Sequence, residues 1–213
     1  MIWSWERALE ALPLLLEGFR ITLLATVLGT LIAAGLGLVI AVLKRALPTP
    51  LRQIVHWATE FVRMTPLVVQ LLFVYYLLTE VSPLVIGVAV IGIHYATYMA
   101  ESYRAGIESV PKGQWEAATA LSLPASRTWR AVVLPQALRA TIPSLGNYAV
   151  AMFKDTPFLF AISVVELVTS AQQFGARNFA YTEAFTLAGL IFLLASYPTS
   201  VLIRRLEKRL AHY

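Results

Sequence analysis

Acidic and basic side chains occur at short spacing inside otherwise apolar stretches of this sequence. Glu60 and Arg63 are three residues apart, and Glu101 and Arg104 repeat that spacing. Residues three apart on a helix share a face, so each acid can pair with its base. Charged groups in an apolar environment are costly unless they are paired or hydrated, which makes them candidates for a solute pathway. Structural pairing near helix ends is the alternative.

A glutamine and a Thr-Pro pair lie close to the first acid-base pair. Gln70 follows Arg63 by seven residues, which on a continuous helix places both on one face about two turns apart. Pro66 lacks a backbone donor, so Thr65-Pro66 would open the helix locally. Because lipid cannot satisfy such polar groups, we expect them to face inward.

The stretch FKDTP, residues 153–157, offers a second set of polar groups. Lys154 and Asp155 could pair with each other or with Glu166. Thr156-Pro157 would break the helix and free backbone groups for a polar solute, although an ordinary helix end is the alternative. The pathway candidates are Glu60, Arg63, Thr65, Gln70, Glu101, Lys154, Asp155, Thr156 and Glu166. A cavity lined with both signs of charge suits a zwitterion, such as an amino acid or a compatible solute like ectoine.

The sequence carries no catalytic or metal-binding motif that we recognise. It contains no cysteine, and His56, His94 and His212 lie far apart without the spacing of metal ligands. It also lacks H-E-x-x-H, G-x-S-x-G and the phosphate-binding G-x-x-x-x-G-K-[ST]. We therefore expect no enzyme activity, metal or cofactor in this chain, and we interpret the histidines as isolated polar side chains.

The composition predicts that membrane-spanning helices position these residues. Hydrophobic residues make up 58% of the 213 residues and charged residues only 14%, against about a quarter charged in soluble domains. Apolar runs near the ~20 residues that cross a bilayer predict an all-α integral membrane protein with one domain, residues 1–213. The predicted spans are residues 14–43, 54–78, 83–103, 137–153 and 185–203. Residues 158–167 are too short to span, so we expect a re-entrant or interfacial helix there.

The basic residues predict how these spans are oriented. Most of the 17 Lys and Arg residues follow the first span, lie between the third and fourth, or follow the fifth. Cytoplasmic loops carry an excess of basic residues, so five spans would place the N-terminus outside and the C-terminus in the cytoplasm. The same asymmetry explains the net charge of +5 without a nucleic-acid partner. Membrane lipid is the expected surrounding.

The segment between the third and fourth spans, residues 107–135, is amphipathic. Helical spacing runs over Ile107–Leu123, with Pro111 where a first turn tolerates proline. Within it, Glu116–Ala118 would form a small flat surface. We expect a second short helix over Arg127–Leu134 that Pro135 ends. Two such helices form a knob that could dock in a groove of another protein, and a loop lying on lipid headgroups is the alternative.

The stretch EAATALSLPASRTWRAVVLP, residues 116–135, resembles the EAA loop of permease subunits of binding-protein-dependent ABC importers. The family pattern is EAA, three residues, Gly, nine residues, Ile, one residue and Leu-Pro. Ser122 stands at the glycine and Val132 at the isoleucine. Because serine tolerates a positive φ poorly, we do not expect one at Ser122. The resemblance implies that the residues coupling to an ATPase are Glu116, Ala117, Ala118, Ser122, Leu134 and Pro135.

Three further stretches resemble the polar amino acid branch of that family, and the resemblance covers roughly residues 15–205. They are FVRMTPLVVQLLFVYY, AESYRAGIESVPKGQWEAA and FKDTPFLFAISVVEL. The resemblance implies a type I importer permease fold in a bacterial inner membrane and half of a translocation pathway. A second permease subunit, identical or homologous, would form the other half.

The resemblance also implies partners outside the bilayer. An ATPase dimer in the cytoplasm would bind ATP and Mg, and an extracytoplasmic solute-binding protein would deliver a polar amino acid-like solute. The competing hypothesis is a non-transporting membrane scaffold that recruits a cytoplasmic partner through the same loop. That hypothesis explains the loop but leaves the charges within the spans unexplained.

Overall fold

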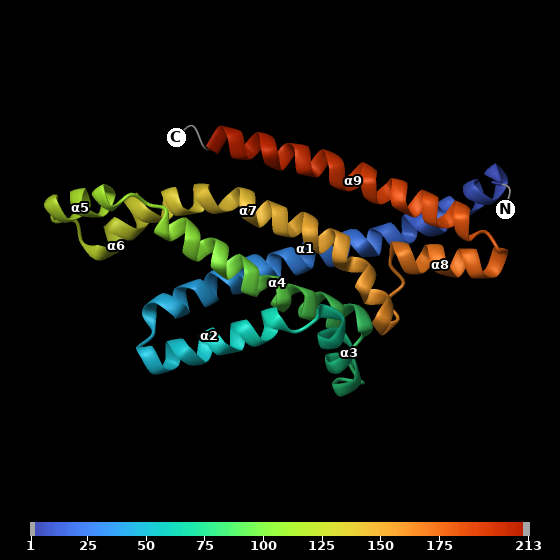
Figure 1. The fold of residues 1–213 in the computed structure, drawn as a ribbon, viewed down its shortest axis with the longest axis horizontal. Helices are drawn as coiled ribbons and strands as arrows, with labels where there is room; N and C mark the ends of the chain where they lie inside the picture. Colours follow the sequence, from blue (N-terminus) through green and yellow to red (C-terminus); the bar gives the residue numbers. More distant parts are fainter. Residues whose placement is uncertain (1–2, 211–213) are drawn as a thin grey trace.

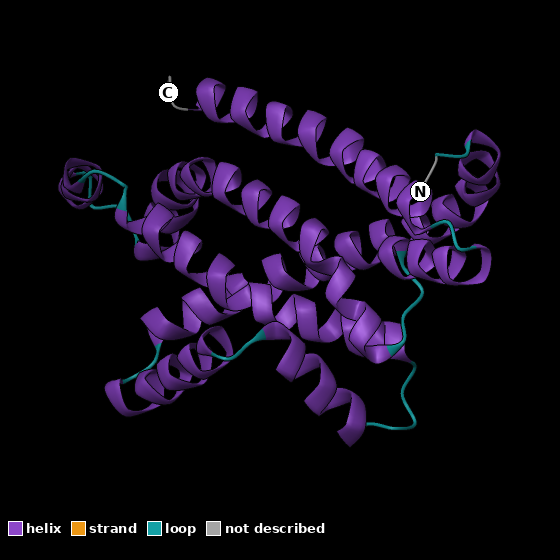
Figure 2. Ribbon diagram, turned by 45° about the vertical axis from the view of Figure 1, so that its right-hand side comes forward, coloured by secondary structure: helices purple, strands orange, loops and turns teal. Residues whose placement is uncertain are grey.

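The computed structural model describes residues 3–210, and helices make up nearly all of this part of the chain (Figure 1, Figure 2). The first half contains α1 Trp5–Ala46, α2 Thr49–Met64, α3 Leu67–Leu77 and α4 Pro83–Glu108. The second half contains α5 Lys112–Ala120, α6 Ala125–Arg127, the π-helical η1 Thr128–Val133, α7 Leu134–Asp155, the 3-10 helix η2 Thr156–Ile162, α8 Leu167–Asn178 and α9 Tyr181–Leu210. Of the three histidines, His212 lies outside the described residues.

Within the described residues, three helices are long and apolar enough to cross a membrane, namely α1, α4 and α9. Two bent pairs raise the number of spans to as many as five: α2 with α3, bent by 104°, and the helical run 125–162 with α8, bent by 52°. The predicted spans 14–43, 83–103 and 185–203 each fall inside one of the long helices, and 137–153 falls inside α7. The predicted all-α membrane architecture is therefore confirmed.

Two predicted helices differ in detail. The second span is interrupted at Thr65-Pro66, as expected, but the 104° bend means that α3 does not continue the face of α2. The short helix predicted at 158–167 is the 3-10 helix Thr156–Ile162, and α8 begins only at Leu167. Both differences follow from prolines, which remove a backbone donor and disfavour a helical residue before them.

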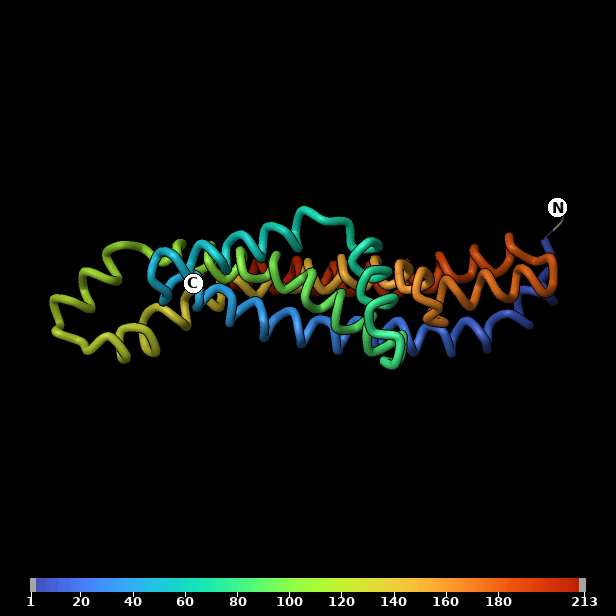
Figure 3. Tube along the Cα trace, turned by 90° about the horizontal axis from the view of Figure 1, so that it is seen from below, coloured from blue at the N-terminus to red at the C-terminus, as the bar shows by residue number. Residues whose placement is uncertain are grey.

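A hairpin projects from one end of the bundle, where the turn between α1 and α2 and the end of α9 also lie (Figure 1, Figure 3). We call residues 112–133 the end hairpin; it comprises α5, a turn at Ser122, α6 and η1. The expectation that Pro135 ends a helix is wrong, because the chain stays helical from η1 through α7. The wider π-helical turn precedes Pro135, where a missing amide and a bulky ring would otherwise disturb an α-helix.

The helix α1 is the spine of the bundle and packs against α4, α7, α8 and α9. Its buried positions recur every three or four residues and are mostly small: Ala11, Leu15, Gly18, Thr22, Ala25, Gly29, Ala33, Gly37 and Ala41. Leucines on its other faces are exposed. Helices in lipid associate through close packing more than through the hydrophobic effect, so small residues at the contact matter.

We expect Gly37→Leu to destabilise the protein by about 1–3 kcal/mol, the usual cost of overpacking. A Cβ at Gly37 would lie 3.0 Å from the Ala96 carbonyl oxygen and 3.0 Å from Met99 Cβ, on α4. Gly35→Leu is the matched control, because nothing lies within 4 Å of a Cβ there. Thermal unfolding of the two purified variants in detergent measures the difference. Equal melting temperatures would contradict the proposed α1–α4 contact.

Candidate functional site

Charged residues from α1, α2 and α4 line one cavity of about 470 Å³. Glu60 pairs with Arg63, as the spacing predicts. Glu101 accepts from Arg104 Nε at 2.8 Å, also as predicted, and from Lys44 Nζ at 3.1 Å. The structure thus brings Glu60, Arg63 and Glu101 to one place and adds Lys44, which sequence spacing does not reveal because it comes from another helix.

Gln70 forms hydrogen bonds with residues at the α2–α3 break. It does not share a helix face with Arg63, because the two helices meet at 104°. Its Nε2 lies 2.6 Å from the Val62 carbonyl oxygen and 2.7 Å from Thr65 Oγ1. Val62 is four residues before Pro66, so its carbonyl is the group that the missing proline amide would have served. Thr65 Oγ1 also lies 3.2 Å from this carbonyl oxygen. The side chains of Thr65 and Gln70 therefore satisfy the broken helix.

A polar and aromatic cluster, buried at His94 and Tyr95 and half-buried at its other members, connects this break to the end of α7. Gln70 Oε1 lies 3.1 Å from His94 Nδ1, and the His94 ring is 5.7 Å from Tyr95 and 5.4 Å from Tyr98. Tyr95 Oη donates to Asp155 Oδ2 at 2.6 Å. We call Gln70, His94, Tyr95, Tyr98, Tyr148 and Asp155 the central cluster; Tyr148 joins it through Tyr98 at 5.7 Å.

Sequence analysis missed four members of the central cluster. The histidine spacing predicts that His94 is isolated, and no motif marks Tyr95, Tyr98 or Tyr148. A signal was present, because His94 and Tyr98 are four residues apart and lie on one helix face. The partner residues come from α3 and α7, so only the tertiary structure shows that these side chains meet.

The remaining pathway candidates have local roles in the structure. Lys154 is exposed. Thr156 is buried, and its hydroxyl donates to the Phe153 carbonyl at 2.8 Å. Glu166 is buried and caps α8, accepting from the amides of Val168 at 2.9 Å and Thr169 at 2.7 Å. The predicted pairing of Lys154 with Asp155 or Glu166 is wrong. Within residues 3–210, Asp155 accepts a hydrogen bond from Tyr95, and Glu166 accepts from amides of α8.

An aromatic contact joins the two arms of the end hairpin. Trp115 on α5 and Trp129 on η1 meet edge to face with centroids 5.4 Å apart. Glu116 and Ala117 are exposed, but Ala118 is buried and so does not lie on the flat surface predicted for it. Downstream, Leu134 is exposed and Pro135 is half-buried.

Ser122 adopts the conformation that the sequence argued against. Its φ is +51°, in the left-handed region. Its amide donates to the Thr119 carbonyl at 2.9 Å, which closes the end of α5. Helices commonly end in one left-handed residue, usually glycine. Ser122 therefore ends α5 in a conformation that glycine adopts more readily.

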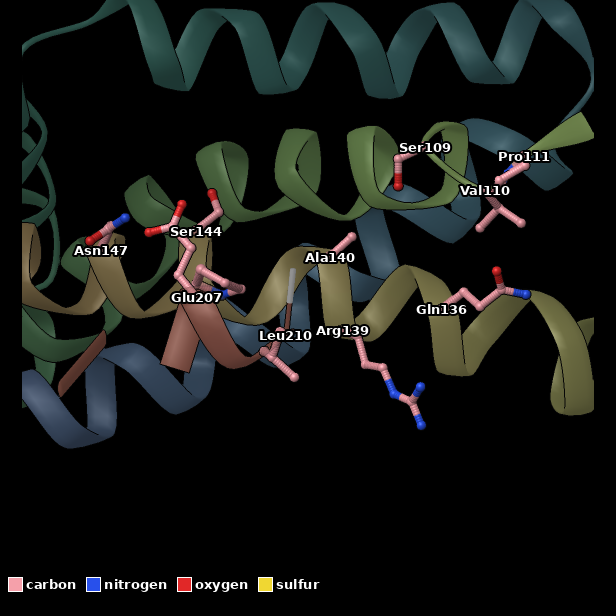
Figure 4. A pocket seen from close by; sticks show the side chains of 11 residues that line it. Ser109, Val110, Pro111, Gln136, Arg139, Ala140, Ser144, Asn147, Glu207 and Leu210 are labelled. Carbon is pink, nitrogen blue, oxygen red and sulfur yellow. The ribbon is translucent and has the colours of Figure 1, made fainter. Parts of the chain in front are cut away.

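A second cavity, of about 520 Å³, lies at the base of the end hairpin (Figure 4). Its lining comes from the segment that follows α4, from α7 and from the end of α9, and includes Ser109, Gln136, Ser144, Asn147 and Glu207. Arg139 extends away from α4 in this view (Figure 4). The cavity separates α9 from the rest of the bundle at the hairpin end.

The fold and these sites define a multi-pass helical membrane protein with a buried polar cluster and a hairpin at one end. The chain belongs to the family of binding-protein-dependent transport system inner membrane components, whose model matches residues 25–212.

Relatives agree with this assignment. The chain is 39% identical to a probable amino-acid ABC transporter permease protein, y4tG, of Sinorhizobium fredii, covering 95% of this chain and 90% of that protein. It is 36% identical to the glutamine transport system permease protein GlnP of Escherichia coli, covering 99% of each. It also resembles a chain in the crystal structure of an amino acid ABC transporter with histidines, with a TM-score of 0.91, 30% identity and coverage of 98% of this chain and 100% of that one.

The chain is therefore the permease subunit of an ATP-driven ABC importer in an inner membrane, and a separate ATPase subunit hydrolyses ATP. Binding-protein and ATPase partners follow from the family in general. The relatives named above give no support to ectoine as the solute or to a non-transporting scaffold.

We expect Gln70→Leu to destabilise the protein by about 1–3 kcal/mol, the cost of removing a hydrogen-bond partner from partly buried polar groups at the helix break and from His94. Thermal unfolding in detergent is the measurement. Gln172→Leu, at an exposed position on α8, is the control for the same change in side chain. If Gln70→Leu unfolds at the same temperature as the unmodified protein, Gln70 does not stabilise the helix break.

Backbone strain at Ser122 can be tested with two substitutions. We expect Ser122→Val to destabilise the end hairpin by about 1–2 kcal/mol, because left-handed φ is unfavourable for residues with a Cβ and most of all for β-branched ones. Ser122→Gly should leave the hairpin at least as stable. Limited proteolysis of the turn reports both effects. Ser126→Val, in helical α6, is the control, and equal proteolysis of the two valine variants would argue against a strained turn.

Proposed function

We propose that this chain forms half of a pathway for a polar amino acid or a similar zwitterion, with the central cluster at the solute site. The observation that carries the proposal is the series of polar and ring contacts that runs from the α2–α3 break through the buried His94 and Tyr95 to Asp155. The names of the relatives, one for glutamine and others for amino acids, support this class of solute.

The chemistry of the central cluster suits such a solute. Asp155 offers a carboxylate that can accept from an ammonium group, a charge-assisted hydrogen bond. Tyr98 and Tyr148 present aromatic rings, whose faces attract cations. Arg63, near the end of α2, lies close to the central cluster, because its carbonyl oxygen is 3.4 Å from Tyr98 Oη. A guanidinium here can pair with the carboxylate of a zwitterion if it exchanges Glu60 for the solute.

A second permease subunit, identical or homologous, would complete the pathway, and an extracytoplasmic binding protein would supply the solute. We place the N-terminus outside and the end hairpin and C-terminus in the cytoplasm. In support, Lys44 and Arg45 end α1, and Lys208 and Arg209 end α9, at the same end of the molecule as the hairpin (Figure 1). Basic residues favour the cytoplasmic side.

In this orientation the end hairpin reaches the ATPase dimer, which holds ATP and Mg. Exposed Glu116 and Ala117 would enter a groove of the ATPase, while Ala118 packs inside the hairpin and keeps its shape. Ser122 shapes the turn, and Leu134 and Pro135 continue into α7. Closure of the ATPase would move the hairpin and, through it, the spans around the central cluster.

Uptake into vesicles that contain the permease, its ATPase and its binding protein tests the proposal. We expect Asp155→Asn to lower the apparent affinity for solute about ten- to a hundredfold, because a charge-assisted hydrogen bond contributes ~1.5–3 kcal/mol. The amide can still accept from Tyr95, so the fold should persist. Glu17→Gln, at an exposed site on α1, is the control.

Two results would contradict the proposal. Unchanged uptake kinetics in Asp155→Asn would remove the central cluster from the solute site. ATPase recruitment by the unmodified permease without any solute uptake would favour the scaffold hypothesis.

A further inference from the structure

Arg45, in the last turn of α1, contacts both arms of the end hairpin. Its Cζ lies 5.0 Å from the centroid of the Trp129 ring on η1 and 5.7 Å from that of the Trp115 ring on α5. The two rings meet at 81°. The guanidinium thus occupies the corner formed by two perpendicular indoles.

This geometry has the features of a cation–π contact. A guanidinium within ~6 Å of an indole centroid is attracted to the ring, and tryptophan is the most favourable partner. Arginine is also planar and weakly hydrated, so it packs on aromatic faces better than lysine does. The neighbouring Lys44 is directed to Glu101 instead. The acidic residue that faces Arg45 from the end of α4 is Glu108, and the two side chains line the same cavity of about 220 Å³.

The contact matters because a small core lies at the base of the end hairpin. Val110, Val133 and Ala137 form that core, with Trp115 and Trp129 packed against it. This cluster is separate from the two larger clusters that hold the bundle together. The indoles that Arg45 contacts are therefore the same groups that hold the two arms of the hairpin together.

We propose that Arg45 is a positioning residue for coupling: it fixes the end hairpin to α1, so that a force on the hairpin reaches the spine of the bundle. The inference rests on the proposed role of the end hairpin in contacting the ATPase. Basic residues at this end are expected from topology alone, but topology does not place one between two tryptophans.

The first test measures the contact itself, by hydrogen exchange in the intact complex. Arg45→Gln should make the amides of residues 112–133 exchange about two- to fivefold faster, the range that one exposed cation–π contact supports. Peptides from α8 should be unchanged. The exchange rate in Arg45→Lys should lie between those of the unmodified protein and Arg45→Gln, because lysine keeps the charge but lacks the planar group. Arg205→Gln, exposed near the end of α9, removes the same charge as a control.

The second test measures coupling as ATP hydrolysed per solute imported in vesicles. Arg45→Gln and Trp129→Leu should each raise this ratio, and the double variant should raise it no further than the larger single effect, because residues in contact are not additive. If Arg45→Gln fails to assemble, Arg45→Lys provides the same comparison with the charge retained.

The outcomes separate this inference from the proposed function. Unchanged hydrogen exchange in Arg45→Gln would overturn the role of Arg45. So would additive increases in the ATP hydrolysed per solute imported when Arg45→Gln and Trp129→Leu are combined, a result that would assign Arg45 to lipid headgroups. Absence of solute uptake by the unmodified complex would overturn the proposed function, while the hydrogen-exchange result would still decide whether Arg45 fixes the hairpin.

Discussion

Backbone hydrogen bonding in a bilayer is the constraint on which this structure depends. Lipid offers no partner to an exposed carbonyl, so each helix break must be satisfied within the protein. The Thr-Pro pairs at 65–66 and 156–157, where helices are interrupted, meet that demand in the same way. Thr65 directs its hydroxyl toward the Val62 carbonyl oxygen and Thr156 toward that of Phe153, each four residues before the proline. At these two sites the threonine hydroxyl therefore provides a partner for the carbonyl that the proline cannot serve.

Satisfied breaks allow polar groups to gather inside an apolar bundle. The α2–α3 break places Gln70 against His94, and the end of α7 places Asp155 against Tyr95. Both partners lie on α4, which is covered by the small-residue face of α1. The close α1–α4 packing excludes lipid from one side of these groups. The central cluster thus depends on the breaks for its polar members and on α1 for its burial.

The sequence predicts local features of this protein well and distant contacts poorly. Apolar runs predicted the spans, and three-residue spacing predicted the Glu60–Arg63 and Glu101–Arg104 pairs, because both signals are local. Lys44 at Glu101 and Tyr148 at Tyr98 join residues far apart in the chain, so no local pattern reveals them. The prediction for Ser122 failed because closure of the hairpin outweighs the modest backbone preference of serine.

The helix α4 joins the proposed solute site to the end hairpin. It carries His94, Tyr95 and Tyr98 of the central cluster, then Glu101 and Arg104, and leads directly into Val110 of the hairpin core. Its only proline is at its first position, where proline does not disturb a helix. Coupling over distance requires rigid elements with defined contacts at both ends. An uninterrupted α4 meets that requirement, whereas the α2–α3 pair changes direction by 104° at Thr65-Pro66 and so does not form one rigid rod along the bundle.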